Sequence, residues 1–400
     1  CSIGAAGGSL FPAGVALSMK YAAGVMIAAV ARMMLFGGKL LQYSSVYAPL
    51  LAGVSLFLPS AAVNMTGNFT AADLLLCAAE ALLSMAAAWF FASLLGSLPL
   101  YFSGWVPSFT DAFFESVSGF TTTGATNLPD VEILPKALNM WRCQMHWLGG
   151  MGIVALTVAL MPLLGVGGFK LIKAETTGVE KGKVTPKIAT TAKILWIIYF
   201  SFTIIQTILL KLAGMSWYDA LAHTLSTLGT GGFSTKNSSI AYYNSPAIEW
   251  ICTVFMFLAA INFSLYYYAV TFKFKEIIQN SEFKAFIFIV FATALGITFF
   301  IYNVYNNFGH SFREALFQTT SIISTTGFSS VNFDLWPAGA KIFLLLLMLI
   351  GGCSGSTAGG VKVIRWVVLS KQTTNEVRKM LHPHGVFNVQ LNGRVGRKDV

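Results

Sequence analysis

Eight runs of mostly apolar residues, each long enough to cross a lipid bilayer as a helix, dominate this 400-residue sequence. About 20 such residues span the hydrocarbon core in helical form. None of the runs alternates apolar and polar residues as a barrel strand would. The pattern therefore predicts an all-α polytopic membrane protein. The runs lie at roughly 16–36, 44–63, 72–101, 137–165, 188–213, 247–271, 284–304 and 338–370.

The charges fit the same class of protein. Only 10% of the residues are charged and 55% are hydrophobic, whereas a soluble domain spends about 25% on Asp, Glu, Lys and Arg. The net charge of +10 does not predict a nucleic-acid partner, because the bases fall between the apolar runs rather than along one face. The loop at 166–193, the next alternate loop and the tail after 360 are rich in Lys and Arg. By the positive-inside rule these are cytoplasmic, and the connections between them face outside.

The three connections predicted to face outside share a pattern. An aromatic residue follows a serine directly, an acid stands three positions after that serine, and alanine follows the acid. A glycine stands sixteen positions after the serine. The acids are Asp111, Asp219 and Glu314. The serine–glycine pairs are Ser108 and Gly124, Ser216 and Gly232, and Ser311 and Gly327.

This pattern predicts a short helix followed by an extended segment. Serine at the N-cap with an acid three residues on is typical of a helix start. About 12 residues separate that start from the Thr/Gly run, or some 18 Å of helix, which is too short to span a bilayer. Non-helical backbone is tolerated at membrane depth only inside protein or along a water-filled path. The alternative, that these small residues only let helices pack closely, explains one segment better than three in register.

Three such segments predict a cation pore. The negative C-terminal end of each short helix would point at its centre. Glycine permits the positive φ that turns successive carbonyls toward one axis, and rings of carbonyls can replace the hydration shell of a potassium ion.

Four detailed motifs carry a resemblance to a known family. They are E-S-V-S-G-F-T-T-T-G-A-T (115–126), Q-M-H-W-L-G-G-M-G-I (144–153), G-G-F-S-T (231–235) and G-G-C-S-G-S-T-A-G-G-V-K-V-I-R (351–365). From about residue 72 onward the chain resembles the TrkH branch of the Trk/Ktr/HKT superfamily of potassium transporters. The resemblance implies potassium uptake across the bacterial inner membrane, with K⁺ as the transported ion and no covalent cofactor.

The resemblance also assigns residues to an ion filter and a gate. The filter falls on Thr121, Thr122, Thr123 and Gly124, on Gly229, Thr230, Gly231 and Gly232, and on Ser324, Thr325, Thr326 and Gly327. An intramembrane gate loop falls on Gly351, Gly352, Cys353, Ser354, Gly355, Ser356, Thr357, Ala358, Gly359 and Gly360. Five glycines inside one span, each costing a helix about 1 kcal/mol against alanine, also predict a break there. Lys362 and Arg365 are either cytoplasmic anchors or contributors to gating.

The expected organisation is a series of helix–pore loop–helix repeats. Residues 1–70 form an N-terminal helix pair, and the family has four repeats where this sequence gives three, so we expect an incomplete chain. The repeats are 71–169, 170–272 and 273–370, and 371–400 is a cytoplasmic link to a fourth. The implied partners are the lipid bilayer, a second copy of the chain in a homodimer, and a cytosolic nucleotide-binding ring subunit similar to TrkA.

Two other functional classes fit the sequence less well. A secondary transporter that couples a solute to Na⁺ or H⁺ would use broken helices too, but it needs intramembrane carboxylates, and the filter segments hold none. An enzyme is not expected, because the histidines are dispersed and the glycine-rich run lacks the Gly-Lys-Ser/Thr end of a phosphate loop. Arg142, beside Trp141, was interpreted as an interfacial anchor, and His223 as part of the pore wall.

Overall fold

The computed structural model describes residues 71–163, 188–382, 390–391 and 394–395. The first two predicted spans and most of the basic loop that follows the fourth lie outside these residues. Within them the chain is helical, apart from a two-residue antiparallel pairing of β1 (Gln390–Leu391) with β2 (Arg394–Val395).

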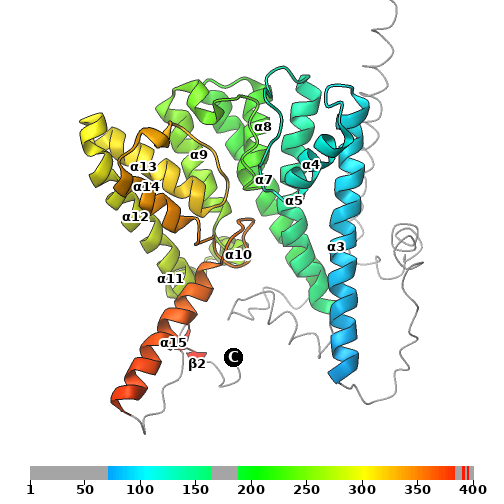
Figure 1. Cartoon of the computed structure of the whole chain (residues 1–400). Helices are drawn as coiled ribbons and strands as arrows, with labels where there is room; N and C mark the ends of the chain where they lie inside the picture. Colours follow the sequence, from blue (N-terminus) through cyan, green and yellow to red (C-terminus); the bar gives the residue numbers. More distant parts are fainter. Residues whose placement is uncertain (1–70, 164–187, 383–389, 392–393, 396–400) are drawn as a thin grey trace, which may run out of the picture.

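Long and short helices occur along the chain, and Figure 1 shows how they are arranged. In order they are α3 (Ala71–Phe102), α4 (Phe109–Phe120), α5 (Lys136–Leu163), α7 (Ile188–Leu212), α8 (Trp217–Leu228), η1 (Ser239–Tyr243), α9 (Pro246–Ala259), α10 (Phe263–Val270), α11 (Phe274–Gln279), α12 (Ser281–Tyr305), α13 (Phe308–Ile323), η2 (Phe333–Leu335), α14 (Ala338–Leu347) and α15 (Val363–Leu381).

Each of α4, α8 and α13 packs between two neighbours in the chain. α4 lies against α3 and α5, α8 against α7 and α9, and α13 against α12 and α14. α8 also contacts α5, and α13 also contacts α9, so each repeat is joined to the one before it. We call α4, α8 and α13 the pore helices. In Figure 1 α15 extends from the opposite end of the molecule, away from them.

The starts of the first two pore helices agree with the sequence, and the third start was placed wrongly. Ser108 and Ser216 are N-caps whose hydroxyls accept from the backbone N–H of Asp111 (3.4 Å) and Asp219 (3.0 Å). In the third repeat the N-cap is Asn307, whose side chain accepts from His310 N at 3.1 Å. α13 therefore begins one turn before Ser311, and that serine is buried inside the helix. The asparagine, also a strong N-cap residue, was overlooked.

The composition of the sixth apolar run predicted one continuous helix, but the structure has two. α9 and α10 meet at an angle of 96°. At the break, the Asn262 side chain accepts from Ser264 N (2.9 Å), and the Ala260 carbonyl accepts from Cys353 N (2.9 Å). A side-chain cap and a partner from another segment satisfy the groups that a continuous helix would have paired. Asn262, the one asparagine in this run, is the sequence feature that could have indicated the break.

The last apolar run is divided by a loop. α14 ends at Leu347 and α15 begins at Val363, and the glycine-rich segment between them is not helical. α15 then continues to Leu381. Part of the basic segment that we expected to be a link is thus the second half of this helix.

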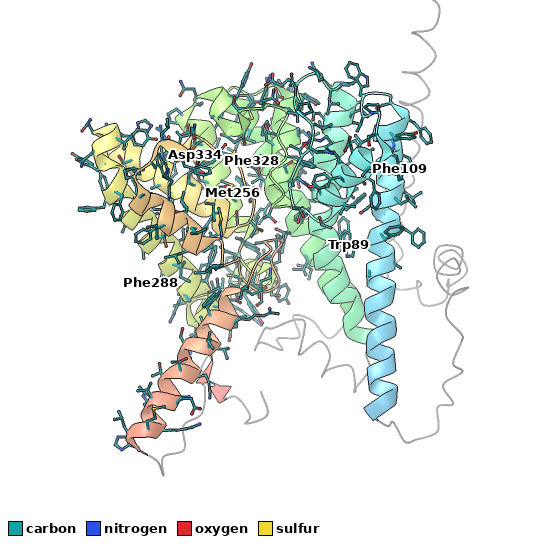
Figure 2. All side chains as sticks on the ribbon, in the orientation of Figure 1. Trp89, Phe109, Met256, Phe288, Phe328 and Asp334 are labelled. Atoms are coloured by element: carbon teal, nitrogen blue, oxygen red, sulfur yellow. The ribbon has the colours of Figure 1, made fainter. Side chains whose placement is uncertain are left out.

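The outer surface is rich in apolar side chains. Phe288 is 72% exposed, whereas Met256 and Phe328 are buried in the interior, as Figure 2 shows. Among the described residues, two helical segments are long and apolar enough to cross a membrane, Ile194–Leu212 and Ser281–Tyr305, and the bent α9–α10 pair counts as a third if it is one broken span.

Candidate functional site

The three pore helices end in the same turn. In each repeat the second residue of the predicted filter segment is a threonine in the left-handed region, with φ of 55° at Thr122, 53° at Thr230 and 56° at Thr325. This conformation is uncommon for a β-branched residue. Glycine usually occupies it at a helix C-terminus. The strain recurs three times, which marks these turns as a functional candidate rather than an accident of packing.

The hydrogen bonds of the three turns are also the same. The N–H of the third filter residue reaches back five residues to a carbonyl inside the pore helix, and the N–H of the left-handed threonine reaches back three. This is the Schellman pattern. The five-residue bonds are Thr123 N to Ser118 O (2.9 Å), Gly231 N to Ser226 O (3.0 Å) and Thr326 N to Ser321 O (2.9 Å).

The glycine that closes each segment meets the neighbouring repeat. Gly124, Gly232 and Gly327 have φ of 75°, 79° and 83°. A Cβ on Gly124 would collide with the carbonyl oxygen of Gly231, and one on Gly232 with that of Thr326. Among the described residues nothing lies within 4 Å of a Cβ on Gly327. The filter segments of successive repeats therefore lie side by side, with the third residue of one against the glycine of the one before.

The second filter segment contains two more glycines than the others because α5 packs too closely against it to leave room for a Cβ. A Cβ on Gly229 would collide with the backbone of His146, and one on Gly231 with its imidazole ring. The same ring stacks on Phe233, with ring centroids 4.0 Å apart. The sequence pattern gave no reason for these two extra glycines, because His146 lies in a different repeat.

Arg142 is not an interfacial anchor, so that interpretation is corrected. It is 1% exposed, and its Nε lies 2.9 Å from Oε2 of the fully buried Glu115. Its other nitrogens donate to Asn139 Oδ1 (2.8 Å) and Thr126 Oγ1 (3.2 Å). The pair thus joins α5 to the first pore helix and to the segment that leaves its filter. Glu115 precedes Arg142 by 27 residues, so nothing local in the sequence announced it.

His223 lies in the second pore helix and is packed inside the protein. It is fully buried, with Nδ1 2.8 Å from Asp219 O and Nε2 2.9 Å from Ser234 Oγ. Its ring therefore connects the pore helix to the segment beyond the filter.

The glycine-rich loop lies directly against the predicted filter segments. Thr230 donates from Oγ1 to the carbonyl of Thr357 (2.9 Å), and Gly359 donates from its N–H to Thr325 Oγ1 (2.7 Å). Both threonines are the left-handed residues of their filter turns. The loop and two of the three filter turns therefore share hydrogen bonds.

Glu282, at the start of α12, binds both the middle of this loop and the start of α15, and the sequence pattern did not indicate it. It is 4% exposed. Oε1 accepts from Ser354 N (2.6 Å) and from Ile364 N (3.2 Å), and Oε2 accepts from Ser354 Oγ (2.8 Å). A buried carboxylate with three donors is expensive to desolvate and strongly oriented. In the sequence Glu282 follows a basic loop, and its position is typical of an acid in the first turn of a helix, so nothing there indicates a contact with the loop.

The two candidate gating charges stand where the loop becomes α15. Lys362 is the N-cap residue, and its amine donates to the carbonyl of Ala358 within the loop. Arg365 lies one turn into the helix and is exposed. The structure thus brings Lys362 to the loop.

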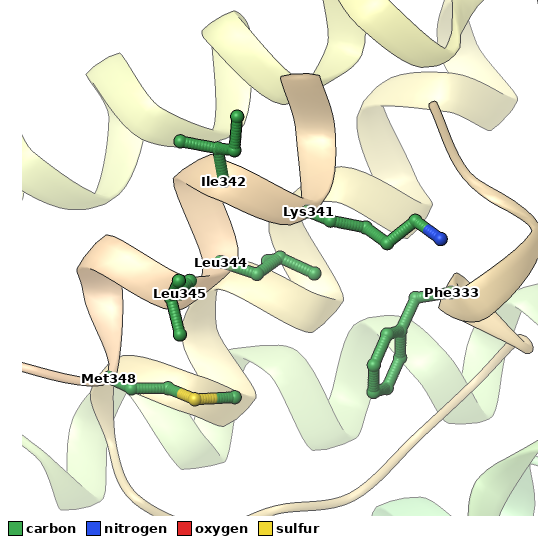
Figure 3. Close-up of a pocket in the computed structure, with 6 residues that line it drawn as sticks. All are labelled: Phe333, Lys341, Ile342, Leu344, Leu345 and Met348. Carbon is green, nitrogen blue, oxygen red and sulfur yellow. The ribbon is translucent and has the colours of Figure 1, made fainter. Parts of the chain in front are cut away.

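Outside the filter, the described residues offer an apolar groove and no metal-binding cluster of three or more His, Cys, Asp or Glu. Figure 3 shows the groove beside α14. The Lys341 amine at its edge donates to Asp334 O (2.7 Å). The groove supplies no carboxylate for a cation. It is lined by Phe333, Lys341, Ile342, Leu344, Leu345 and Met348.

Comparison with known proteins gives a consistent result. Residues 60–399 match the family model TrkH, described as a cation transport protein. The Trk system potassium uptake protein TrkH of Halomonas elongata is 42% identical over 320 residues, which are 78% of this chain and 65% of that protein. TrkH of Vibrio parahaemolyticus is 44% identical over 293 residues, which are 72% of this chain and 60% of that protein. The crystal structure of the potassium transporter TrkH from Vibrio parahaemolyticus matches with a TM-score of 0.71 at 34% identity, over 96% of this chain and 79% of that chain.

These matches confirm the fold class that the apolar runs predicted, an all-α polytopic membrane protein. The chain spans less than two thirds of the length of the two relatives named, 65% and 60%.

Proposed function

The chain belongs to the TrkH family of cation transport proteins, and on that premise we propose that it carries potassium ions into the bacterial cell across the inner membrane. The ions pass through a channel-like pore whose filter is built from backbone carbonyls of the three repeated segments. The membrane potential supplies the driving force, about 2.3 kcal/mol per charge per 100 mV.

One observation carries the filter proposal: three turns of the same backbone conformation touch one another at their glycines. Each turn follows the C-terminal end of a pore helix, where the helix dipole favours a cation. The third residue of a segment lies against the glycine of the preceding repeat, which brings carbonyls of different repeats together. Backbone carbonyls at such a site can replace water around K⁺. A further segment, the expected fourth repeat, would complete the ring at Gly327.

The loop at residues 351–360 is proposed as the gate. It lies against the filter on the side from which α15 projects, and its bonds to Thr230 and Thr325 are few enough to break and re-form. Lys362 and Arg365 would transmit motion of α15 to the loop. The basic segments, α15 among them, would face the cytoplasm and dock a nucleotide-binding ring subunit, and the protein would act as a homodimer.

Growth of a potassium-uptake-deficient bacterium at limiting K⁺ tests this proposal. The complete reading frame should restore growth, and Gly232→Ser should abolish it or admit Na⁺, because the new side chain collides with a filter carbonyl. Gly104→Ser is the matched control. Gly104 also has a φ of 75° but meets nothing within 4 Å, so its backbone strain is similar and its collision is absent. Growth restored equally by wild type and Gly232→Ser would refute the filter assignment.

A further inference from the structure

Each of the three acids that recur on the pore helices accepts a hydrogen bond from a residue sixteen positions later. Asp111 Oδ1 accepts from Asn127 Nδ2 at 2.7 Å. Asp219 Oδ1 accepts from Thr235 Oγ1 at 2.7 Å. In the third repeat Ser330 Oγ donates to Glu314 Oε2 at 2.5 Å. We call these three bonds the carboxylate braces.

The braces lie at equivalent positions relative to the filter. Each donor stands three residues beyond the filter glycine, on the segment that leaves the filter. Each acceptor lies on the pore helix that enters it. The filter turn is therefore held at two points, by the Schellman bonds at the helix C-terminus and by the brace beyond the glycine. With both points held, the segment between them cannot slide along the pore helix.

Other hydrogen bonds, closer to the filter, also join each pore helix to the segment that leaves the filter. Glu115 Oε1 accepts from Thr126 Oγ1 at 2.5 Å, and His223 pairs with Ser234 in the second repeat. Ser118 and Ser321 donate from Oγ to the carbonyl of the residue after the filter glycine, both at 2.6 Å. None of these bonds closer to the filter is described in all three repeats, whereas a carboxylate serves as acceptor in all three braces.

We propose that Asp111, Asp219 and Glu314 are positioning residues that set the spacing of the filter carbonyls and thereby the preference for K⁺ over Na⁺. This proposal rests on the proposed filter. Discrimination between the two ions depends on carbonyls being kept from closing around the smaller one, by cavity size or by their number and field. A carboxylate acceptor makes a stronger and shorter bond than a neutral one, so it resists that collapse better.

The second brace offers the cleanest test, because its two carboxylate oxygens do separate work. Oδ1 accepts from Thr235, and Oδ2 accepts from the Ser216 hydroxyl at 2.7 Å. Thr235→Val removes the brace without changing side-chain shape, and Thr235→Ser keeps the hydroxyl. Ser216→Ala removes the helix cap and leaves the brace, so it serves as the control for a merely structural loss.

The measurement is the ratio of K⁺ to Na⁺ uptake by the full-length protein in proteoliposomes. Thr235→Val should lower the ratio by about fivefold, the factor expected for one hydrogen bond, whereas Thr235→Ser and Ser216→Ala should keep it near the wild-type value. A reduced uptake rate with an unchanged ratio in Thr235→Val overturns the positioning role.

Two results separate this proposal from the proposed function. A wild-type protein that carries no K⁺ overturns both. A K⁺-selective wild type with an equally selective Thr235→Val overturns the braces alone. If Thr235→Val does not accumulate in the membrane, Asp111→Ala gives the same test at an exposed pair. Asp111→Asn keeps only a neutral acceptor, so its K⁺/Na⁺ ratio should fall between those of Asp111→Ala and wild type.

Discussion

Replacing Glu282 should release the glycine-rich loop from the proposed filter. The carboxylate accepts from the N–H groups of Ser354 and Ile364 and from the Ser354 hydroxyl. Gln keeps one carbonyl oxygen for the two N–H donors, and the serine hydroxyl can turn to accept from its amide. Glu282→Ala instead leaves both buried N–H groups without the side-chain partner.

The size of the effect follows from these bonds. Hydrogen bonds to a charged acceptor contribute about 1.5–3 kcal/mol each, and neutral ones about 1 kcal/mol. Removing the charge also removes the desolvation cost of a carboxylate that is 4% exposed, which offsets part of the loss. We therefore expect Glu282→Gln to shift the loop equilibrium by about 1–2 kcal/mol, roughly 5–30-fold. Glu282→Ala should shift it by about 3 kcal/mol, because each orphaned N–H costs about 1–3 kcal/mol.

The buried thiol of Cys353 reports on the loop directly. It is 0% exposed, so a thiol reagent reaches it only when the loop moves. In a protein whose only cysteine is Cys353, the modification rate measured by mass spectrometry should rise in the order wild type, Glu282→Gln, Glu282→Ala. Glu276→Gln, at an exposed carboxylate on α11, is the control and should match wild type. Equal modification rates for Glu282→Ala and wild type, with both proteins folded, would refute this reasoning.

Three further predictions concern other contacts. Thr230→Val, which loses the bond to the loop but keeps its shape, should change basal K⁺ uptake about fivefold, measured by ⁸⁶Rb⁺ influx without any effector. Arg142→Met should lower stability by about 3–5 kcal/mol, because it strands the buried Glu115 carboxylate, and a thermal melt in detergent should show partial recovery when Glu115→Gln is added. Asn237 donates to Asp130 and holds the pKa of that carboxyl below its ordinary value. The bond to Asp130 therefore stabilises the fold at pH values above the ordinary pKa of Asp, and this contribution is lost as the pH falls through the lowered pKa. The difference in melting temperature between wild type and Asn237→Ala should narrow in acid to the part that comes from the lost bond between Val131 N and Asn237 Oδ1.

The three helix C-terminal turns were predictable because their signal repeats inside the sequence. A fixed sixteen-residue spacing with an acid and a glycine at set places reports a shared backbone shape even without coordinates. The acids themselves were interpreted as helix-start residues. Their bonds beyond the filter were not foreseen, because the donors differ in type, being Asn127, Thr235 and Ser330.

Contacts between distant residues were beyond sequence reasoning. Arg142 stands next to a tryptophan, which favoured an interfacial position, and its partner lies on another helix. The 96° bend between α9 and α10 falls in a run that is almost uniformly apolar. The N–H of Cys353, in the last repeat, donates to the Ala260 carbonyl that the bend leaves without a helical partner. Hydrophobicity locates a span, but tertiary hydrogen bonds decide whether it stays straight.

The carboxylate braces also bear on the order in which the molecule folds. Each closes a loop of sixteen residues, whereas the bonds that join neighbouring repeats, such as Val131 N to Asn237 Oδ1, connect residues more than a hundred positions apart. Short loops close first, because the entropy lost on closure grows with loop length. Each pore loop can thus take its final shape as it leaves the ribosome. The repeats would then assemble by docking of pore loops that are already folded, and the whole chain would not need to become ordered at once.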